Sequence, residues 1–419
     1  MKGNKMADFD TPSTFAARRI IETVGSSGTP PQWGFHFFSA GLDSYLNVLE
    51  QDYLASYLPQ GGATFKLLVG TYGGGKTHFL YSVRALGWKH GFPVAYVTLS
   101  PEASPFHRLD RVYAEIARSI ALPVTSEDAF QSMETGLLPL LKMWHLRLME
   151  DLEERDIPES KRISALVQMA ERAVQGLESL QMQKALVNAV EALARDKHNE
   201  LADLLQWLTA AGYARERHKR YGLLHAIDKS VALSMLRSLT QWVRQLGYPG
   251  LCILFDEAEQ VPSLSTRQRD ALLSNLRELI DECGHQHFAG VLMVYAVPDS
   301  NFFEGRSSVY EALNQRISSV FEVFNPTGVT IRLDELEIDP LELLQAIGLK
   351  LAEVYERAFD LLLPNKGPIV GAVAKAAYEQ RFGDIGYKRL FVQGCVKAFH
   401  LARAGQATPL DLESARKLL

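Results

Sequence analysis

Residues 65–77 constrain the fold of this chain more than any other segment. A short apolar run, Phe65–Val69, leads directly into Gly70-Thr71-Tyr72-Gly73-Gly74-Gly75-Lys76-Thr77, which fits the pattern G-x-x-x-x-G-K-[ST] at every position. An apolar run that ends in glycines is typical of a buried parallel strand, and a helix is expected from Lys76 to about Lys89. The segment therefore predicts a strand, a loop and a helix of an α/β fold with a parallel sheet.

The glycines of this loop favour the binding of an anion. Without a Cβ the backbone can approach closely, so its N–H groups can wrap phosphate oxygens, and the helix N-terminus that follows favours negative charge. We expect Lys76 to reach the β- and γ-phosphates of ATP and the Thr77 hydroxyl to bind Mg²⁺. The predicted nucleotide-binding set is the whole loop together with His78. A chance match is expected in roughly one or two per cent of chains this long.

A second apolar run ends in two carboxylates. Gly250–Phe255 predicts a buried strand that delivers Asp256 and Glu257 to the edge of the sheet. There Asp256 can hold Mg²⁺ through water, and Glu257 can polarise the attacking water as a general base. Strands often end in polar residues, so this pattern gains its weight from the glycine loop.

The rest of the chain predicts a helical surround for this sheet. Further strands are expected at 93–99, 289–297 and 329–333, and helices at 11–24, 42–58, 109–120 and 266–280. Residues from about 121 to 240 are rich in Leu, Ala, Glu, Gln, Lys and Arg and predict a helical insertion, while 340–419 predicts a helical tail. The predicted domains are 1–62, an N-terminal helical segment; 63–330, the core with its insertion; and 331–419, a C-terminal helical lid.

Two arginines are predicted to act on the nucleotide from outside the loop. Arg316 is the preferred arginine finger for a neighbouring subunit, with Arg306 as the second choice. Arg389, in the helical tail, can bend over the nucleotide from a lid. The alternative for Arg316 is an ordinary solvated helix arginine, and for Arg389 it is a surface or helix-capping arginine.

Weaker hypotheses concern the ends of the other strands. Asp299 and Ser300 follow the strand at 289–297 and can sense the γ-phosphate, or form a surface turn. Thr98 or Ser100, at the end of the second strand, can contact Glu257.

Charge and cysteine content exclude several classes of protein. The net charge of −5 provides no global positive field for nucleic acid, and the one dense basic cluster, 215–221, is either a DNA contact or a solvated face. Three scattered cysteines argue against a disulfide framework and for a reducing compartment. Cys283–His287 has no second Cys/His pair at metal-site spacing. No secretory signal and no run of about eighteen apolar residues is present, so a cytoplasmic protein without a membrane span is expected.

The order of these features resembles an AAA+ ATPase of the kind found among origin-recognition and loader proteins. Five segments narrow the resemblance to the BrxD family, the ATP-binding proteins of BREX-type bacteriophage-defence systems: RRIIETV at 18–24, SAGLDSYL at 39–46, GTYGGGKTHFL at 70–80, GYPGLCILFDEAEQ at 247–260 and GYKRLF at 386–391. The similarity spans most of the chain and is patchy across 121–240.

This resemblance implies a P-loop NTPase fold, AAA+-like, and a prokaryotic cytoplasmic ATPase that forms a homo-oligomer, acts on DNA and works beside helicase-like or methyltransferase-like defence proteins. One departure is that neither Asn nor Thr directly ends the strand at 289–297, which puts the timing of hydrolysis in question.

Three functions remain open at this point. The first is an ATPase that couples turnover to the assembly or remodelling of a DNA-associated complex. The second is a slow, nucleotide-gated switch or scaffold, which does not need a general base at Glu257. The third is a small-molecule kinase, which the long helical insertion and tail disfavour.

Overall fold

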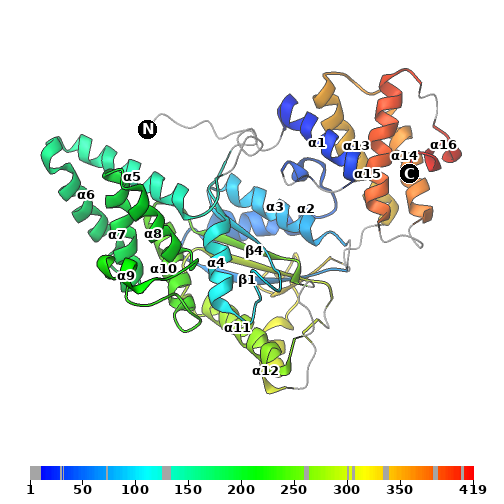
Figure 1. The fold of residues 1–419 in the computed structure, drawn as a ribbon. Helices are drawn as coiled ribbons and strands as arrows, with labels where there is room; N and C mark the ends of the chain where they lie inside the picture. The colour runs from blue at the N-terminus through cyan, green and yellow to red at the C-terminus, as the bar shows by residue number, and fades with distance from the viewer. Residues whose placement is uncertain are drawn as a thin grey trace.

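The computed structural model describes residues 11–28, 31, 33–71, 74–124, 134–258, 264–299, 302–303, 307–333, 339–380, 386–406 and 410–419. In this part of the chain a six-stranded sheet lies at the centre, with helices on both of its faces (Figure 1). The expected mixed α/β fold with a largely parallel sheet is confirmed.

The sheet has the strand order β3-β2-β4-β5-β1-β6. The strands are β1 (Ala63–Val69), β2 (Val94–Thr98), β3 (Ile120–Ala121), β4 (Leu251–Asp256), β5 (Val291–Val297) and β6 (Thr330–Arg332). All neighbours run parallel except β2 and β3. Every residue of β4 and β5 is buried, which explains why both appear in the sequence as unbroken apolar runs.

The carboxyl ends of the parallel strands meet at one edge of the sheet. β1 and β5 end in register at Val69 and Val297, and β2 pairs with β4 at Thr98 and Asp256. The loops that follow β1 and β4 therefore lie at the same edge of the sheet. Ligands of such sheets bind at this edge.

Different helices cover the two faces of the sheet. Along β1, Phe65 and Leu67 pack into one hydrophobic cluster and Leu68 into another, as the two-residue period of a strand requires. Helix α3 (Lys76–Lys89) covers one face together with α2 (Asp43–Val48) and its continuation, the π-helix η2 (Leu49–Tyr57). Helices α4 (Leu109–Ser119), α10 (Ala232–Gln245) and α11 (Thr266–Gly284) cover the other.

A group of helices separates β3 from α10 in the sequence. They are α5 (Leu137–Glu154), α6 (Glu159–Val174), α7 (Leu180–Ala194), α8 (His198–Leu208), α9 (Arg215–His218) and the 3-10 helix η4 (Lys219–Tyr221). Their apolar faces are continuous with the core beneath α4 and α10. Figure 1 shows them extending to one side of the sheet.

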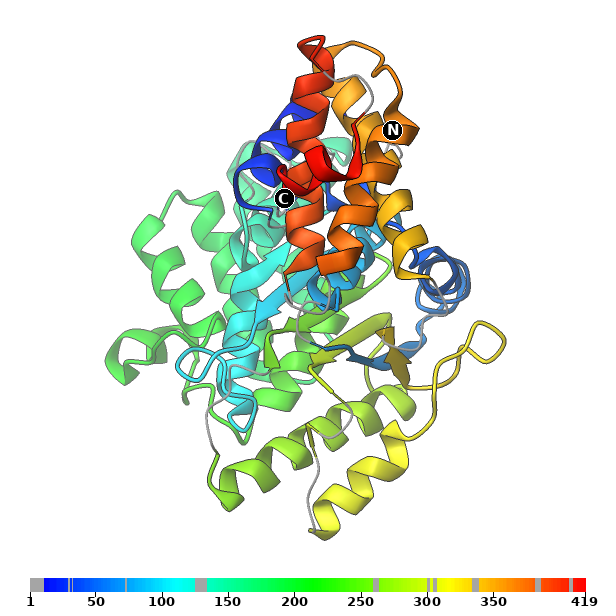
Figure 2. The same cartoon turned by 90° about the vertical axis from the view of Figure 1, so that its right-hand side faces the viewer.

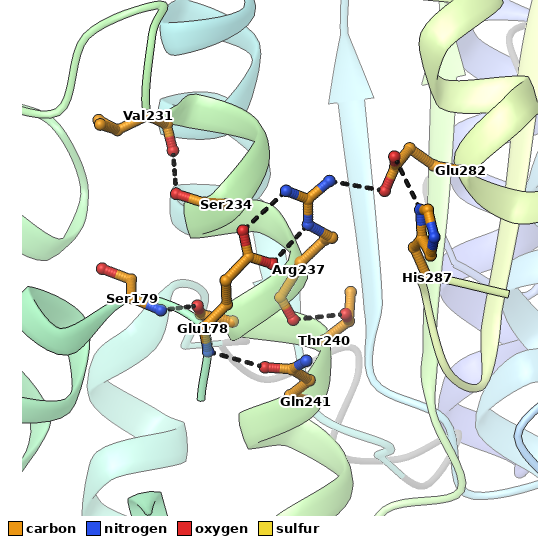
Figure 3. Close-up of polar contacts among 10 residues, drawn as sticks. Glu178, Ser179, Val231, Ser234, Arg237, Thr240, Gln241, Glu282 and His287 are labelled. Carbon is orange, nitrogen blue, oxygen red and sulfur yellow. Dashed lines mark hydrogen bonds and ion pairs between the residues drawn. The ribbon is translucent and has the colours of Figure 1, made fainter. Parts of the chain in front are cut away.

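Arg237 of α10 ties this group to the core helix α11 (Figure 3). Its Nε and Nη2 donate to the Glu178 carboxylate over 2.5 and 2.7 Å, and its Nη1 donates to Glu282 Oε2 over 2.8 Å. The Ser179 N–H also donates to Ser238 Oγ over 2.8 Å. The start of α7 is thus fastened to α10, the helix that leads into β4.

The C-terminal helices form a second hydrophobic core beside the sheet domain (Figure 2). Helix α12 (Ser308–Ile317) packs on α11, and β6 then leads to α13 (Pro340–Phe359), α14 (Lys366–Gln380), α15 (Tyr387–Arg403) and α16 (Leu412–Arg416). Helix α1 (Thr14–Ser27) packs against α13 and α15, although it lies at the other end of the sequence. The division of the chain at 62/63 and 330/331 stays a prediction.

Candidate functional site

The glycine loop connects β1 to α3 at the carboxyl edge of the sheet. Gly75 has φ +102°, a conformation that side chains rarely adopt, and it caps the N-terminus of α3. A Cβ on Gly74 would lie 2.9 Å from the Thr71 carbonyl oxygen, which itself accepts a hydrogen bond from the Gly74 N–H. Tyr72 and Gly73 lie outside the described residues. The described part of the loop is therefore a tight backbone turn at which two positions need glycine.

Lys76 begins α3 and is 6% exposed. Its ammonium donates hydrogen bonds to the Gly70 carbonyl over 2.9 Å and to the Thr71 carbonyl over 3.3 Å. The positive charge is thus held against the inner side of the loop, where the N-terminal end of α3 also favours an anion.

Asp256 brings together residues from three separate parts of the sequence. Its Oδ2 accepts hydrogen bonds from the hydroxyls of Thr77, over 2.8 Å, and Tyr96, over 2.5 Å. Its Oδ1 accepts one from the Glu257 N–H over 2.9 Å. The Asp256 residue is only 3% exposed, and these three donors compensate for the burial of its carboxylate. Burial, together with the charge of Asp256, raises the pKa of Tyr96, so its phenol remains a donor.

Glu257 follows with a left-handed backbone, φ 60°. A residue other than glycine in this region costs about 1–3 kcal/mol, and such residues are concentrated at functional sites. Its side chain is partly exposed, next to the buried Asp256, at the open edge of the sheet.

The Thr77 hydroxyl and the Asp256 carboxylate fit a magnesium ion. Both are oxygen donors within hydrogen-bonding distance of each other, and Mg²⁺ is usually bound by one or two carboxylates together with phosphates and water. Among the described residues no three His, Cys, Asp or Glu side chains are grouped as a metal cage. The residues therefore suit an ion that a phosphate ligand brings with it.

His78, the next residue of α3, contacts the 3-10 helix η1 (Phe35–Phe38) and the residue that caps it. It hydrogen-bonds to the Ser39 hydroxyl, and its ring lies edge-on to Phe35 of η1 at a centroid distance of 3.9 Å. Burial, and to a lesser degree the charges of Lys388 and Lys350, lower the pKa of His78 to about 3. The imidazole is thus neutral at the point where α3, η1 and the helices α13 and α15 converge.

A buried arginine packs among the aromatic rings next to the Asp256 site. Arg84 of α3 is 6% exposed, and its guanidinium lies over the rings of Trp33 and Tyr81, 3.9 and 4.3 Å from their centroids. The Tyr81 ring is 5.0 Å from that of Tyr96. Burial lowers the pKa of Arg84 to about 10, which leaves it charged at neutral pH.

Tyr96, Arg84 and the lysines near His78 were not predicted from the sequence. The available signal for Tyr96 was a polar-tipped aromatic residue inside an apolar strand, two residues before the strand ends. The residues proposed at the end of this strand were Thr98 and Ser100. Thr98 is exposed, and the Ser100 hydroxyl accepts a hydrogen bond from the Ala103 N–H.

The structure shows neither of the two arginines proposed from sequence, Arg316 and Arg389, in contact with the described part of the glycine loop. Arg316 of α12 forms an ion pair with Asp281 of α11, with Nε–Oδ1 and Nη2–Oδ2 distances of 2.5 and 3.0 Å. Arg389 is exposed in the first turn of α15, and it is its neighbour Lys388 whose charge acts on His78. Arg306 and Ser300 lie outside the described residues.

The other sequence hypotheses are placed as follows. In the basic cluster, Arg217 and Arg220 share the Asp203 carboxylate at 3.3 Å each, and Arg215 and Lys219 are exposed. All three cysteines are buried free thiols, so the expected lack of disulfides is confirmed. Among the described residues, no helix has the length and apolar character of a membrane span.

A model of the protein family described as "BREX system ATP-binding protein BrxC/D" matches residues 13–390. The match includes the glycine loop, Asp256, Glu257, Arg316 and Arg389. Searches of curated proteins and of solved structures give no match.

Proposed function

The chain belongs to the BrxC/D family of BREX-system ATP-binding proteins, and on that premise we propose that it binds ATP with Mg²⁺ at the carboxyl edge of its sheet and hydrolyses it. The family makes it an ATP-binding protein of a defence system. The location of the site, the hydrolysis and the work that it drives are the parts proposed.

One contact carries the location: the hydrogen bond of 2.8 Å between the Thr77 hydroxyl and Asp256. These residues are 179 positions apart: Thr77 lies in the first turn of α3, after the loop that follows β1, and Asp256 is the last residue of β4. A glycine loop and a carboxylate that meet at a sheet edge supply the two parts that an ATP–Mg²⁺ ligand needs, a cradle for phosphates and an oxygen anion for the metal.

In this proposal the loop residues Gly70 to Thr77 surround the phosphates with backbone N–H groups, in the manner of a P-loop. Lys76 exchanges its bonds to the loop carbonyls for bonds to the β- and γ-phosphates. Because a charge-assisted bond to phosphate is stronger than one to a neutral carbonyl, the exchange favours the bound state. His78 supports the start of α3 from the side of η1.

Mg²⁺, when bound, neutralises charge on the phosphates and orients them. Thr77 would hold it through its hydroxyl and Asp256 through water, which the buried position of the carboxylate suits. Glu257 accepts a proton from the attacking water as the water oxygen bonds to the γ-phosphorus, while the bond from that phosphorus to the β–γ bridging oxygen breaks and ADP leaves. Its left-handed backbone turns the chain directly after Asp256, so that the two carboxylates take different roles.

The remaining parts of the proposal concern assembly. Arg316 acts in a homo-oligomer as the finger that reaches a neighbouring subunit's γ-phosphate, after leaving its pair with Asp281. Arg389 approaches the nucleotide from a C-terminal lid. The chain is cytoplasmic, and turnover drives the assembly or remodelling of a DNA-associated complex with helicase-like or methyltransferase-like defence proteins.

Replacing Glu257 by glutamine tests hydrolysis. We expect ATP binding within about twofold of the wild-type value and a loss of hydrolysis of about 100-fold or more, because general-base catalysis contributes roughly that factor. Glu278→Gln, at an exposed position of α11, is the matched control and should leave both unchanged. Undiminished phosphate release by the Glu257→Gln protein would refute the proposed base.

A slow nucleotide-gated switch is the second function, and one observation favours it. β5 is apolar and buried through to Val297, so no Asn or Thr side chain from its end reaches toward a γ-phosphate. In this reading defence against phage survives the Glu257→Gln substitution. Mass photometry with and without ATP and DNA then reports whether the assembly depends on bound nucleotide alone.

A further inference from the structure

We propose that Tyr96 is a positioning residue for the metal-binding carboxylate of Asp256: its hydroxyl fixes the carboxylate in the orientation that leaves Oδ1 open to the water shell of Mg²⁺. This inference rests on the proposed ATP–Mg²⁺ site and adds to it a residue from a different strand. The inference starts from the hydrogen bonds of Asp256: Oδ2 accepts hydrogen bonds from two hydroxyls, whereas Oδ1 accepts one from a backbone N–H.

The count of hydrogen bonds decides which oxygen remains available. Each carboxylate oxygen accepts about two hydrogen bonds. Oδ2 accepts from Thr77 and Tyr96 and is therefore saturated, whereas Oδ1 accepts only from the Glu257 N–H. The one remaining acceptor position of this 3% exposed residue is thus on Oδ1, and it can receive a metal-bound water.

Without the Tyr96 hydroxyl, that assignment is lost. Oδ2 would then also have an open acceptor position. The metal-bound water could donate its hydrogen bond to Oδ2 as readily as to Oδ1. The carboxylate would gain freedom about its Cβ–Cγ bond, because among the described residues the Thr77 hydroxyl would then be the one donor left to Oδ2. The orientation of Asp256 therefore depends on a donor that does not itself bind the ion.

The Tyr96 ring is held in place by the side chains of Tyr81 and Arg84. The Tyr81 ring lies at a centroid distance of 5.0 Å, and the Arg84 guanidinium lies 5.5 Å from the Tyr96 centroid and 3.9 Å from that of Trp33. Arg84 is nearly fully buried in this group of aromatic rings. Such a contact between a cation and aromatic faces restricts the ring, so the hydroxyl arrives at Oδ2 in a fixed position.

The strand register explains how the hydroxyl reaches its target. β2 and β4 are parallel neighbours, with Tyr96 paired to Leu254 and Thr98 to Asp256. The Tyr96 side chain therefore starts two residues below the carboxylate and extends toward the carboxyl edge. A phenol has the length to span that offset, whereas serine or threonine at the same position does not.

The test measures how Mg²⁺ strengthens the binding of a fluorescent ATP analogue to the full chain, in wild type, Tyr96→Phe and Tyr113→Phe. Tyr113 is the matched control: it is a fully buried tyrosine whose hydroxyl donates to the Leu208 carbonyl over 2.8 Å, on the opposite side of the sheet from α3. Partners of metal ligands typically change metal affinity by 10–100-fold. We expect Tyr96→Phe to raise the Mg²⁺ concentration for half-maximal enhancement by about tenfold or more, with metal-free affinity within about twofold. Tyr113→Phe should change neither value.

An equal Mg²⁺ dependence in Tyr96→Phe and wild type would overturn the inference while leaving the nucleotide site intact. Wild-type protein that shows no saturable binding of the analogue would overturn the proposed site and this inference with it. If Tyr96→Phe does not fold, Arg84→Lys provides a second route, because a shorter and non-planar cation loosens the ring support while keeping the Tyr96 hydroxyl. A Mg²⁺ dependence identical to wild type in that variant would also contradict the proposed positioning.

Discussion

Replacing Arg237 by methionine tests how firmly the helical insertion is attached to the sheet domain. Arg237 is 21% exposed at its side chain and links Glu178, before α7, to Glu282 in α11 (Figure 3). Methionine keeps much of the packing of the stem and removes all three charged hydrogen bonds.

The expected cost follows from the exposure of the two carboxylates. Glu282 is 12% exposed and loses its arginine partner, which costs about 2–3 kcal/mol for a charge-assisted bond. Glu178 is 38% exposed and regains water, so it adds at most about 1 kcal/mol. The bond from the Ser179 N–H to Ser238 persists and limits the loss. The sum is about 3 kcal/mol, of which at most about 1 kcal/mol joins the start of α7 to α10 and about 2–3 kcal/mol joins α10 to α11.

Hydrogen exchange measured by mass spectrometry reports this attachment locally, which is needed because a chain of this size does not unfold in two states. A loss of about 2–3 kcal/mol corresponds to a fall of roughly 30- to 150-fold in the protection of the α10 and α11 amides near Arg237 and Glu282, and a loss of at most about 1 kcal/mol lowers the protection of α7 by no more than about fivefold. Arg195→Met is the matched control: its exposed pair with Glu191 lies at the C-terminal end of α7, and its loss should leave the protection of α10 and α11 unchanged.

The ion pair between Arg237 and Glu178 should weaken as the pH falls. The Arg237 guanidinium holds the pKa of Glu178 below its usual value of 4.5. The contribution of this pair is therefore fully present above about pH 4.5 and is lost as the pH falls through the lower folded-state value. Equal protection of α10 and α11 in the Arg237→Met and Arg195→Met proteins at neutral pH would contradict the expected cost.

Three further predictions concern separate parts of the molecule. Burial lowers the pKa of Lys66 from 10.5 to about 7. The stability of the wild type should therefore rise as the pH increases from 7 toward 10.5, by at most about 1.4 kcal/mol per pH unit. Lys66→Met should reduce this pH dependence in melting curves. Gly74→Ala places a Cβ 2.9 Å from the Thr71 carbonyl oxygen; ATP binding should fall at least tenfold while the circular dichroism spectrum is unchanged, and normal binding would show that the turn does not need glycine there. If the cluster at 215–221 binds DNA, the double change Arg215→Ser and Lys219→Ser should weaken binding and reduce its dependence on salt, and an unaltered salt dependence would remove the cluster from consideration.

The parts of the fold that were predicted from sequence are those set by local patterns. The apolar runs of β4 and β5 are buried on both faces of a parallel sheet, so their composition alone marks them as interior strands. The segment from β1 through the glycine loop to α3 is likewise continuous in the sequence, and its glycines report the backbone turn directly.

The contacts that the sequence did not predict join distant residues. The hydroxyl of Tyr96 reaches Asp256 only because β2 and β4 are neighbours in a particular register, which no local pattern specifies. Helix α1 has an apolar face that fits several partners, and only the folded chain shows that it packs on α13 and α15.

The most direct test of the central claim is isothermal titration of ATP–Mg²⁺ into the wild type, Lys76→Ala and Lys89→Ala. Both lysines belong to α3, but Lys89 is at its far end and pairs with Glu50 over 2.9 Å. The proposed site predicts saturable binding to the wild type and to Lys89→Ala within about twofold, and a loss of about 10–100-fold in Lys76→Ala, as expected for charge-assisted bonds to phosphate. Wild-type affinity in the Lys76→Ala protein would contradict the placement of the nucleotide on this loop.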